Sequence, residues 1–212
     1  MINDPVGATG RVPRRNRRSI RLKGYDYSQA GAYFVTICTQ GRACLFGDVV
    51  DGEMRLNEYG KIVWDEWYKT AAVRPYMRLD EYGFVVMPNH VHAIVWIVDD
   101  DMVGARRRRA LTREEFGRPI SGSLPTIVRA FKSAVTKRIN EYRRTPGLPV
   151  WQRNYWEHVV RNERALNAIR RYIVENPLRW HMDRYNPNAT GTDPMARDLW
   201  HLLQDDARSK QT

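Results

Sequence analysis

The amino-acid sequence predicts an α+β domain in which helices cover an antiparallel sheet. Runs rich in β-branched and aromatic residues at 33–39, 79–87, 90–98 and 156–160 are typical of strands. Apolar residues recur at helical spacing from Asn57 to about Thr70 and from Leu124 to about Arg143. The order is therefore strand, helix, strand, strand, helix, strand. This order matches the ferredoxin-like, RRM-type arrangement, with both helices on one face of the sheet.

Local signals support the boundaries of these elements. Asn57 and Ser123 are residues that commonly cap the N-terminus of a helix. Gly83, inside the second strand, predicts a bulge or a bend. Pro88 and Asn89 predict a turn between the second and third strands, so these two strands should lie side by side and antiparallel.

The sequence after the fourth strand predicts one additional helix. Asn162 is a probable N-cap by residue type, and Leu166, Ile169 and Ile173 form an apolar stripe behind it. Proline disfavours helix at the residue before it, so the helix should end near Asn176. Residues 181–212 are expected to be a polar C-terminal extension with at most one short turn of helix, at 199–203.

The chain carries 35 Lys and Arg residues against 24 Asp and Glu, a formal net charge of +11. A polyanionic partner is the simplest reason for such an excess, although net charge alone leaves an ordinary basic protein open. The basic residues gather in a flexible arm at 1–23 and in a long loop at 99–122. Residues 24–180 are expected to form one folded domain, which contains the basic loop.

Other bulk properties exclude several classes of protein. No apolar run is long enough to span a membrane, and the arginine-rich N-terminus lacks the apolar stretch of a secretory signal. Cys38 and Cys44 are too few for a four-thiolate zinc site and are expected to be reduced, idle thiols. A cytoplasmic protein without an organic cofactor is expected, as a monomer rather than a homodimer.

His90 and His92 are the first candidate site residues. Side chains two apart in a strand point to the same face, so both imidazoles should project together from a buried strand. Two convergent imidazoles make half of a divalent metal site. The alternative is that both histidines are simply hydrogen-bonded at a sheet face.

Tyr172 and Asn176 are the second candidate pair. They lie four residues apart on the last predicted helix and so share one face. A tyrosine oxygen that attacks phosphorus forms a covalent phosphotyrosine and divides transesterification into two steps. The amide oxygen of Asn176 could be a third metal ligand. The alternative is a core tyrosine followed by a helix-terminal asparagine.

Several motifs in order resemble one known family. Residues 87–92, Met-Pro-Asn-His-Val-His, resemble the signature of the HUH single-strand endonucleases. The chain is more narrowly similar to the REP-associated tyrosine transposases, which are related to the transposases of small single-strand insertion sequences. The supporting stretches are 24–27, 33–37 with 41–42, 131–133, 151–158 and 172–177.

This resemblance implies a fold, a metal and a nucleophile. The family has a ferredoxin-like fold and binds Mg²⁺ or Mn²⁺ through its two signature histidines, which correspond to His90 and His92. Its nucleophilic tyrosine corresponds to Tyr172. The insertion-sequence enzymes have a glutamine ligand where this chain has the shorter Asn176. Family members cleave single-stranded DNA beside hairpins and leave a 5′-phosphotyrosine and a free 3′-hydroxyl.

Residues expected to bind DNA have basic or aromatic side chains, because cations neutralise phosphates and aromatic rings stack on unpaired bases. They are Arg14, Arg15, Arg17, Arg18, Arg107, Arg108, Arg129, Lys132, Trp151, Arg153 and His158. The alternatives are a sheet core for Trp151, an ordinary structural role for His158 and a solvated helix face for Arg129 and Lys132.

Two other functions compete with a tyrosine transposase. A non-catalytic module of the same fold could bind hairpin DNA or RNA, but it would not need two histidines and a tyrosine together. A metal hydrolase acting on a small molecule would not explain the basic excess. Metal-dependent covalent capture of an oligonucleotide separates the transposase from the binding module.

Overall fold

The computed structural model of the protein describes residues 25–98 and 120–208. The predicted basic arm and the arginines expected to bind DNA at 14, 15, 17, 18, 107 and 108 lie outside the described residues. Within the described part of the chain, no helix is long and apolar enough to cross a membrane.

Four strands form the central antiparallel sheet: β1 (Gly31–Cys38), β4 (Met77–Met87), β5 (His90–Ile97) and β6 (Trp156–Val160). Their order across the sheet is β4-β5-β1-β6, and every neighbouring pair is antiparallel. A separate hairpin joins β2 (Gly47–Val50) to β3 (Glu53–Leu56). The predicted α+β class and the antiparallel sheet are confirmed.

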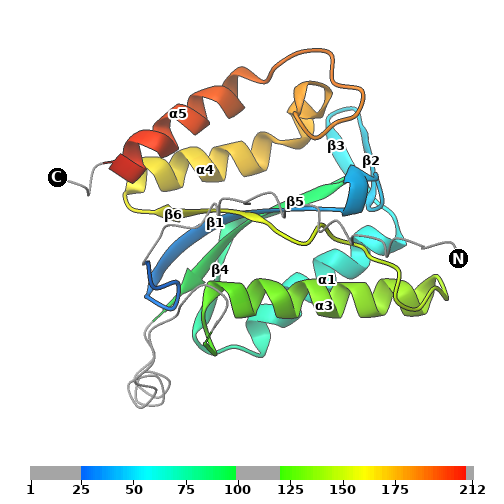
Figure 1. Cartoon of the computed structure of the whole chain (residues 1–212). Helices are drawn as coiled ribbons and strands as arrows, with labels where there is room; N and C mark the ends of the chain where they lie inside the picture. The colour runs from blue at the N-terminus through cyan, green and yellow to red at the C-terminus, as the bar shows by residue number, and fades with distance from the viewer. Residues whose placement is uncertain (1–24, 99–119, 209–212) are drawn as a thin grey trace, which may run out of the picture.

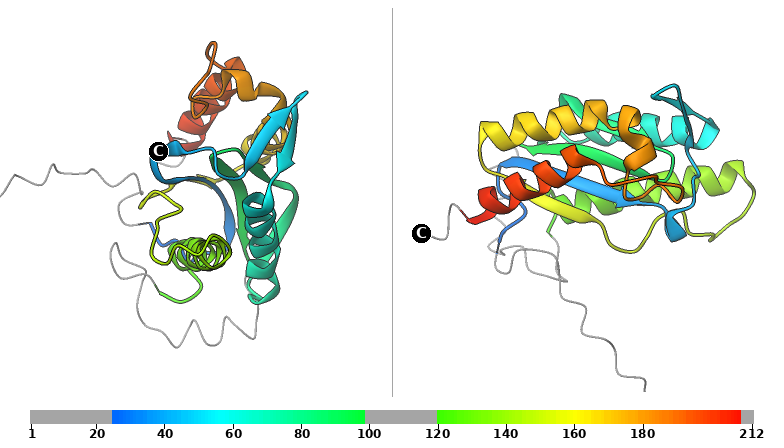
Figure 2. Two further views of the ribbon diagram at one scale, coloured as in Figure 1. Left: turned by 90° about the vertical axis from the view of Figure 1, so that its right-hand side faces the viewer. Right: turned by 90° about the horizontal axis from the view of Figure 1, so that it is seen from above.

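Two helices cover each face of the sheet (Figure 1). Helices α1 (Glu58–Ala72) and α3 (Leu124–Tyr142) pack on one face, as predicted for the two helices that connect the strands. The additional helix α4 (Glu163–Glu175) lies on the opposite face beside α5 (Pro194–Arg208). Seen from above, α4 and α5 lie next to each other across the sheet (Figure 2).

The two faces follow from the alternation of side chains along each strand. In β1, Tyr33, Val35 and Ile37 belong to the core under α1 and α3. Ala32 and Phe34 belong to the second core, under α4 and α5. The sheet is therefore buried on both sides, and a polar side chain on either face needs a partner inside the protein.

Local predictions hold at the N-termini of α1 and α4 and at the predicted bulge, whereas Ser123 precedes α3 without a capping bond from its side chain. The side chains of Asn57 and Asn162 accept hydrogen bonds from the backbone N–H groups of Gly60 and Ala165. The pairing of β4 with β5 shifts register between Leu79 and Phe84, where Gly83 lies. A Cβ at Gly83 would approach the Cβ of Asp80 to 2.5 Å, so glycine is required there.

The expectation of only one short turn of helix near 199–203 was wrong. Helix α5 has 15 residues, and Leu199 and Leu203 are buried against α4 and the sheet. Asp206 is also buried, and it accepts hydrogen bonds from His158 on β6 and from Asn162. The sequence of α5 is mostly polar because only a narrow stripe of the helix is apolar and buried. The helix is therefore stabilised by its contacts with the rest of the domain more than by the helix propensity of its residues.

Candidate metal centre and tyrosine site

His90 and His92 lie at the start of β5 and face the side of the sheet covered by α4. Val91 between them faces the core under α1 and α3. Both imidazoles are buried, and their Nε2 atoms are 3.1 Å apart. The predicted convergence of the two histidines is therefore present in the structure.

A buried asparagine orients His90. The Nδ2 group of Asn89 donates hydrogen bonds to the carbonyl oxygens of Arg42 (3.0 Å) and Tyr185 (2.7 Å). Its Oδ1 atom therefore faces Nδ1 of His90, at 2.9 Å, and accepts a hydrogen bond from the N–H group there. This contact assigns the proton to Nδ1, so Nε2 of His90 carries the lone pair that a metal ligand needs.

His92 is held by its partner across the sheet. Thr36 lies opposite His92 in the pairing of β1 with β5, and its hydroxyl is 2.9 Å from Nδ1 of His92. Burial lowers the pKa of His92 to about 3 and holds that of His90 well below its ordinary value. Both imidazoles are therefore neutral at pH 7, which is the form that binds a metal ion.

Asp183 is a third candidate ligand, and the sequence analysis missed it. It follows the short helix η2 (Pro177–Met182), and its Oδ2 atom is 4.0 Å from Nε2 of His90. One ligand atom from each of His90, His92 and Asp183 lies within 4.8 Å of the others. Burial raises the pKa of Asp183 to about 6. No short spacing in the sequence connects Asp183 with the histidines.

Tyr172 lies beside this group, as predicted. Its ring centroid is 5.1 Å from that of His92, and the side chain is 5% exposed. Burial, and next the charge of Asp183, raise the pKa of its phenol above the ordinary value. A neighbouring positive charge is needed to favour the phenolate in such surroundings.

Asn176 closes α4 on the same side. It is 1% exposed, and neither polar atom of its amide makes a hydrogen bond of normal geometry in the described residues. Burial raises the pKa of Tyr172 and of Asp183, while the Asn176 amide lowers both, so this amide lies beside the two groups. A buried amide whose polar atoms make no hydrogen bond of normal geometry is unusual and fits a ligand to a cation.

The residues present therefore fit a divalent cation. Two neutral imidazoles and one carboxylate converge in a buried volume, and the buried amide of Asn176 lies beside the carboxylate. Nitrogen and oxygen donors without thiolates suit Mn²⁺ or Mg²⁺. Cys38 and Cys44 are both free, and neither belongs to this group.

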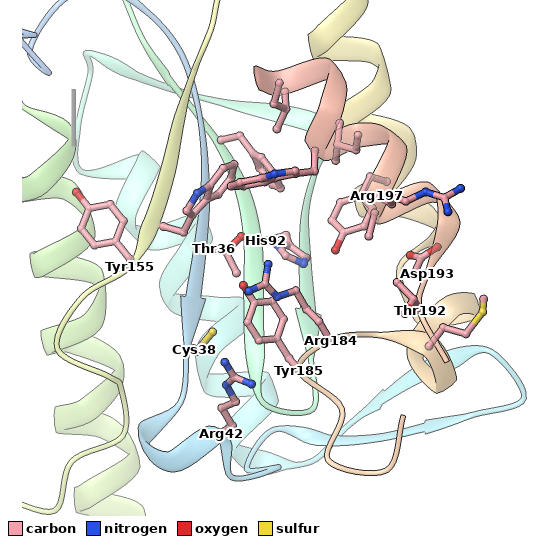
Figure 3. A pocket seen from close by; sticks show the side chains of 18 of the residues that line it. Thr36, Cys38, Arg42, His92, Tyr155, Arg184, Tyr185, Thr192, Asp193 and Arg197 are labelled. Carbon is pink, nitrogen blue, oxygen red and sulfur yellow. Dashed lines mark hydrogen bonds between the residues drawn. The ribbon is translucent and has the colours of Figure 1, made fainter. Parts of the chain in front are cut away.

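Two arginines lie at the edge of the same site, where each contacts the ring of Tyr185. The guanidinium groups of Arg42 and Arg184 lie 5.3 and 5.2 Å from the centroid of the Tyr185 ring, which is itself 4.7 Å from the ring of His90 (Figure 3). Arg42 has a positive φ of 59°, an uncommon conformation for a residue other than glycine. Both arginines are exposed, so they bring positive charge to the edge of a buried site.

A salt bridge fixes the tyrosine helix to the sheet. Arg170 on α4 donates three hydrogen bonds to the carboxylate of Asp80 on β4, at distances between 2.7 and 3.1 Å. Trp96 on β5 donates a fourth, at 3.1 Å. Since Tyr172 lies two residues after Arg170, these contacts determine where α4 presents the tyrosine.

Among the residues that the structure describes, those predicted to bind DNA do not form one surface. Arg129 is exposed on α3, on the face of the sheet away from the histidines. Lys132 is also on α3, but its Nζ atom donates to the carbonyl oxygens of Gln152 (2.6 Å) and Arg153 (3.1 Å). Lys132 therefore holds the chain before β6 in place, and Arg153 is exposed in that segment.

The structure corrects the expected roles of Trp151 and His158. Trp151 is 6% exposed and packs against Phe46 and Phe131 in the core, so its ring cannot stack on a base. His158 is buried, and its Nε2 atom is 2.9 Å from Asp206, so it connects β6 to α5. Its ring therefore has a structural partner instead of a phosphate.

Comparisons with known proteins give two relatives. No family profile matches the chain. A protein of Haemophilus influenzae named only as uncharacterized is 39% identical over 172 residues, which cover 80% of this chain and 92% of that protein. A second Haemophilus influenzae protein carries the name of a candidate REP-associated tyrosine transposase. It is 26% identical over 154 residues, which cover 73% of this chain and 74% of that protein.

Two solved structures are weakly similar. A REP-associated tyrosine transposase bound to a REP hairpin gives a TM-score of 0.48 at 20% identity and covers 75% of this chain and 73% of that chain. A candidate transposase from Deinococcus radiodurans gives a TM-score of 0.35 at 21% identity and covers 74% of this chain and 96% of that chain. The two sequence matches cover 80% and 73% of this chain, so the similarity extends over most of the folded domain.

Proposed function

Because the chain belongs to the REP-associated tyrosine transposase family, we propose that it cuts single-stranded DNA with Tyr172 as the nucleophile. The observation that carries this proposal is the position of the Tyr172 ring, 5.1 Å from that of His92. A tyrosine beside a buried group of metal-ligand type is the arrangement that attack on a phosphodiester requires. Strand transfer would be the reverse step with a new 3′-hydroxyl.

The proposed step is a transesterification. The Tyr172 oxygen attacks the phosphorus atom and forms a Tyr–O–P bond, while the bond from phosphorus to the 3′-oxygen breaks. The phenol proton is lost to water or a base, and the departing 3′-oxygen gains a proton. The products are a 5′-phosphotyrosine and a free 3′-hydroxyl. In the second step a 3′-hydroxyl attacks the phosphotyrosine, restores the phosphodiester and releases the tyrosine.

His90, His92, Asp183 and Asn176 would hold the metal, Mg²⁺ or Mn²⁺. When bound, the metal supplies positive charge that stabilises the phosphoryl group in the transition state. Asn89 and Thr36 keep the two imidazoles oriented. Helix α4, fixed by Arg170 and Asp80, keeps Tyr172 beside them.

The proposed substrate is single-stranded DNA next to a hairpin of the REP type. The net charge of +11 suits a polyanion, and the exposed Arg42 and Arg184 bring part of this charge to the site. Helix α4, which carries Tyr172, is tied by Arg170 to Asp80 on the sheet of the same chain, so the tyrosine meets the histidines without an exchange of helices between subunits. We therefore propose an active monomer that acts on DNA in the bacterial nucleoid.

Labelled single-stranded hairpins from the repeats of the source genome test this function. The protein is incubated with DNA labelled at the 5′ or the 3′ end, with and without Mn²⁺, and the products are separated on a denaturing gel. The account expects a metal-dependent covalent adduct that retains the 3′ label and a free fragment that retains the 5′ label.

His90→Ala and His92→Ala are expected to lose the adduct while still binding the hairpin. Tight binding of the hairpin without any cleavage by the wild-type protein would instead favour a non-catalytic binding module. An adduct that retains the 5′ label would contradict the proposed polarity of the phosphotyrosine.

A further inference from the structure

A cavity of about 780 Å³ opens directly beside the candidate metal centre. His92 and Tyr172 form part of its wall. The rest is lined by β1, by the segment that leads into β6, and by the chain from Met182 to Leu203. Its volume lies in the range of pockets that bind small organic groups, about 300–1,000 Å³.

One end of the cavity is aromatic. Trp156 on β6 lies 5.4 Å from Phe34 on β1 and 5.8 Å from Trp200 on α5, measured between ring centroids. Trp200 is 44% exposed, although Leu199 and Leu203 on the same helix are buried. Those leucines, together with the buried Asp206, dock α5 on the domain, so the docking does not require the Trp200 ring.

The other end of the cavity is cationic. The guanidinium groups of Arg42 and Arg184 lie against the ring of Tyr185, whereas Arg197 lies on α5 near Asp193, away from these two arginines (Figure 3). The ring of His92 lies 5.6 Å from that of Phe34 at the aromatic end and 6.5 Å from that of Tyr185 at the cationic end. An aromatic surface and a cluster of guanidinium groups on either side of a phosphoryl-transfer site match the two parts of a nucleotide, its base and its phosphate.

We propose that this cavity is a subsite for one unpaired nucleotide next to the bond that is cut, with its base on Trp200 and Trp156 and its phosphate toward Arg184. The inference rests on the proposed function, since it places that nucleotide beside Tyr172. A paired base presents no free face to an aromatic side chain, so the subsite requires single-stranded DNA. Helix α5 would thus contribute to substrate binding as well as to the fold.

The first test measures binding without cleavage. A fluorescein-labelled 12-nucleotide oligothymidylate, which cannot form a hairpin, is titrated with protein in EDTA, and its anisotropy is recorded. Trp200→Ala should weaken binding roughly 5- to 100-fold, the effect of losing one stacked base. Trp200→Phe keeps an aromatic ring and should recover most of the affinity.

Trp64→Ala is the matched control. Trp64 is 41% exposed and lies 5.1 Å from the ring of Tyr68, but it is on α1, on the opposite face of the sheet. It should bind the oligothymidylate like the wild-type protein. Equal affinity of Trp200→Ala and Trp64→Ala would overturn the subsite.

A cross-linking experiment on the unmodified protein removes any dependence on the folding of a variant. An oligothymidylate that carries one 5-iodouracil is irradiated with the protein, and the adduct is located by mass spectrometry. Adducts at Trp200 or Trp156 support the subsite, and adducts found only outside the cavity overturn it.

The outcomes also separate this inference from the proposed function. Loss of oligothymidylate binding in Trp200→Ala would support the subsite even if the wild-type protein never formed a phosphotyrosine. Normal oligothymidylate binding by Trp200→Ala, together with a normal phosphotyrosine adduct on hairpin DNA, would reject the subsite and leave the nuclease intact.

Discussion

Asn89 accepts a hydrogen bond from Nδ1 of His90 at 2.9 Å, and this contact leaves Nε2 of His90 free to bind a metal. The same amide donates to the carbonyl oxygens of Arg42 and Tyr185, so its own orientation is fixed on both sides. Asn89 therefore connects the histidine pair to the two segments that carry the flanking arginines. Removing the hydrogen-bond partner of a ligating histidine typically weakens metal binding about 10- to 100-fold.

Asn89→Ala should weaken Mn²⁺ binding about 10- to 100-fold, because His90 loses the partner that fixes its tautomer. Isothermal titration calorimetry with MnCl₂ measures the affinity. Asn140→Ala is a suitable control. Asn140 lies on α3, is also buried, and donates a hydrogen bond to the backbone carbonyl of Leu148. An Asn89→Ala protein with wild-type Mn²⁺ affinity would contradict the role of Asn89.

Asp183→Asn should weaken Mn²⁺ binding more than Asp193→Asn does. Both aspartates are 4% exposed, but only Asp183 belongs to the group with His90 and His92. An amide oxygen carries no net charge and is the weaker ligand for a hard cation. The same calorimetric titration compares the two variants, and equal affinities would remove Asp183 from the ligand set.

Asp80→Ala should lower the free energy of unfolding by about 2–3 kcal/mol, since Arg170 and Trp96 lose a charged acceptor. Urea denaturation measures this loss. Asp65→Ala serves as the control, because Asp65 is exposed and its contact with Arg138 is long, at 3.5 Å, so this ion pair contributes little to stability. The account also expects Asp80→Ala to form less phosphotyrosine adduct per bound hairpin, since α4 is held less firmly. Equal stability of the two variants would show that this bridge does not fix α4.

Lys132 gives the protein a specific dependence of stability on pH. Burial lowers the pKa of Lys132 from its ordinary 10.5 to about 8. Between these two values the unfolded chain binds more protons at this group than the folded protein does, so its contribution to stability rises with pH. The penalty for burying the charged form is complete below pH 8 and is gone above pH 10.5.

Thermal unfolding of Lys132→Met across pH 7.5–10.5 tests this sign. The stability of the wild-type protein should rise relative to Lys132→Met as the pH increases through that window. Lys137→Met, on the exposed side of the same helix, should keep the wild-type pH profile. A parallel profile for all three proteins would show that Lys132 is not perturbed as described.

The strand and helix order and the two histidines could be predicted because they depend on local rules. Alternation along a strand sends His90 and His92 to one face whatever packs on that face. Spacing along a helix likewise puts Tyr172 and Asn176 on one side of α4. Both rules act within a few residues, so the sequence contains all the information that they need.

Asp183, Tyr185 and Trp200 could not be predicted in the same way. They come from the segment after η2, and its path is set by distant contacts such as the bonds from Asn89 to Tyr185 and from His158 to Asp206. The prediction that Trp151 would be exposed was wrong for a related reason. Polar neighbours in the sequence suggested an exposed ring, but an isolated bridge from Thr39 to Trp151 places it in the core beside Phe46.

The most direct test of the account is to identify the tyrosine that becomes attached to DNA. Tyr172 and Tyr185 both lie close to the histidines, with ring centroids 5.1 Å from His92 and 4.7 Å from His90. The wild-type, Tyr172→Phe and Tyr185→Phe proteins are incubated with hairpin DNA and Mn²⁺, and the adduct is digested and sequenced by mass spectrometry. The account predicts a nucleotide on Tyr172, no adduct in Tyr172→Phe despite normal hairpin binding, and a persistent adduct in Tyr185→Phe. An adduct that survives in Tyr172→Phe would contradict its central claim.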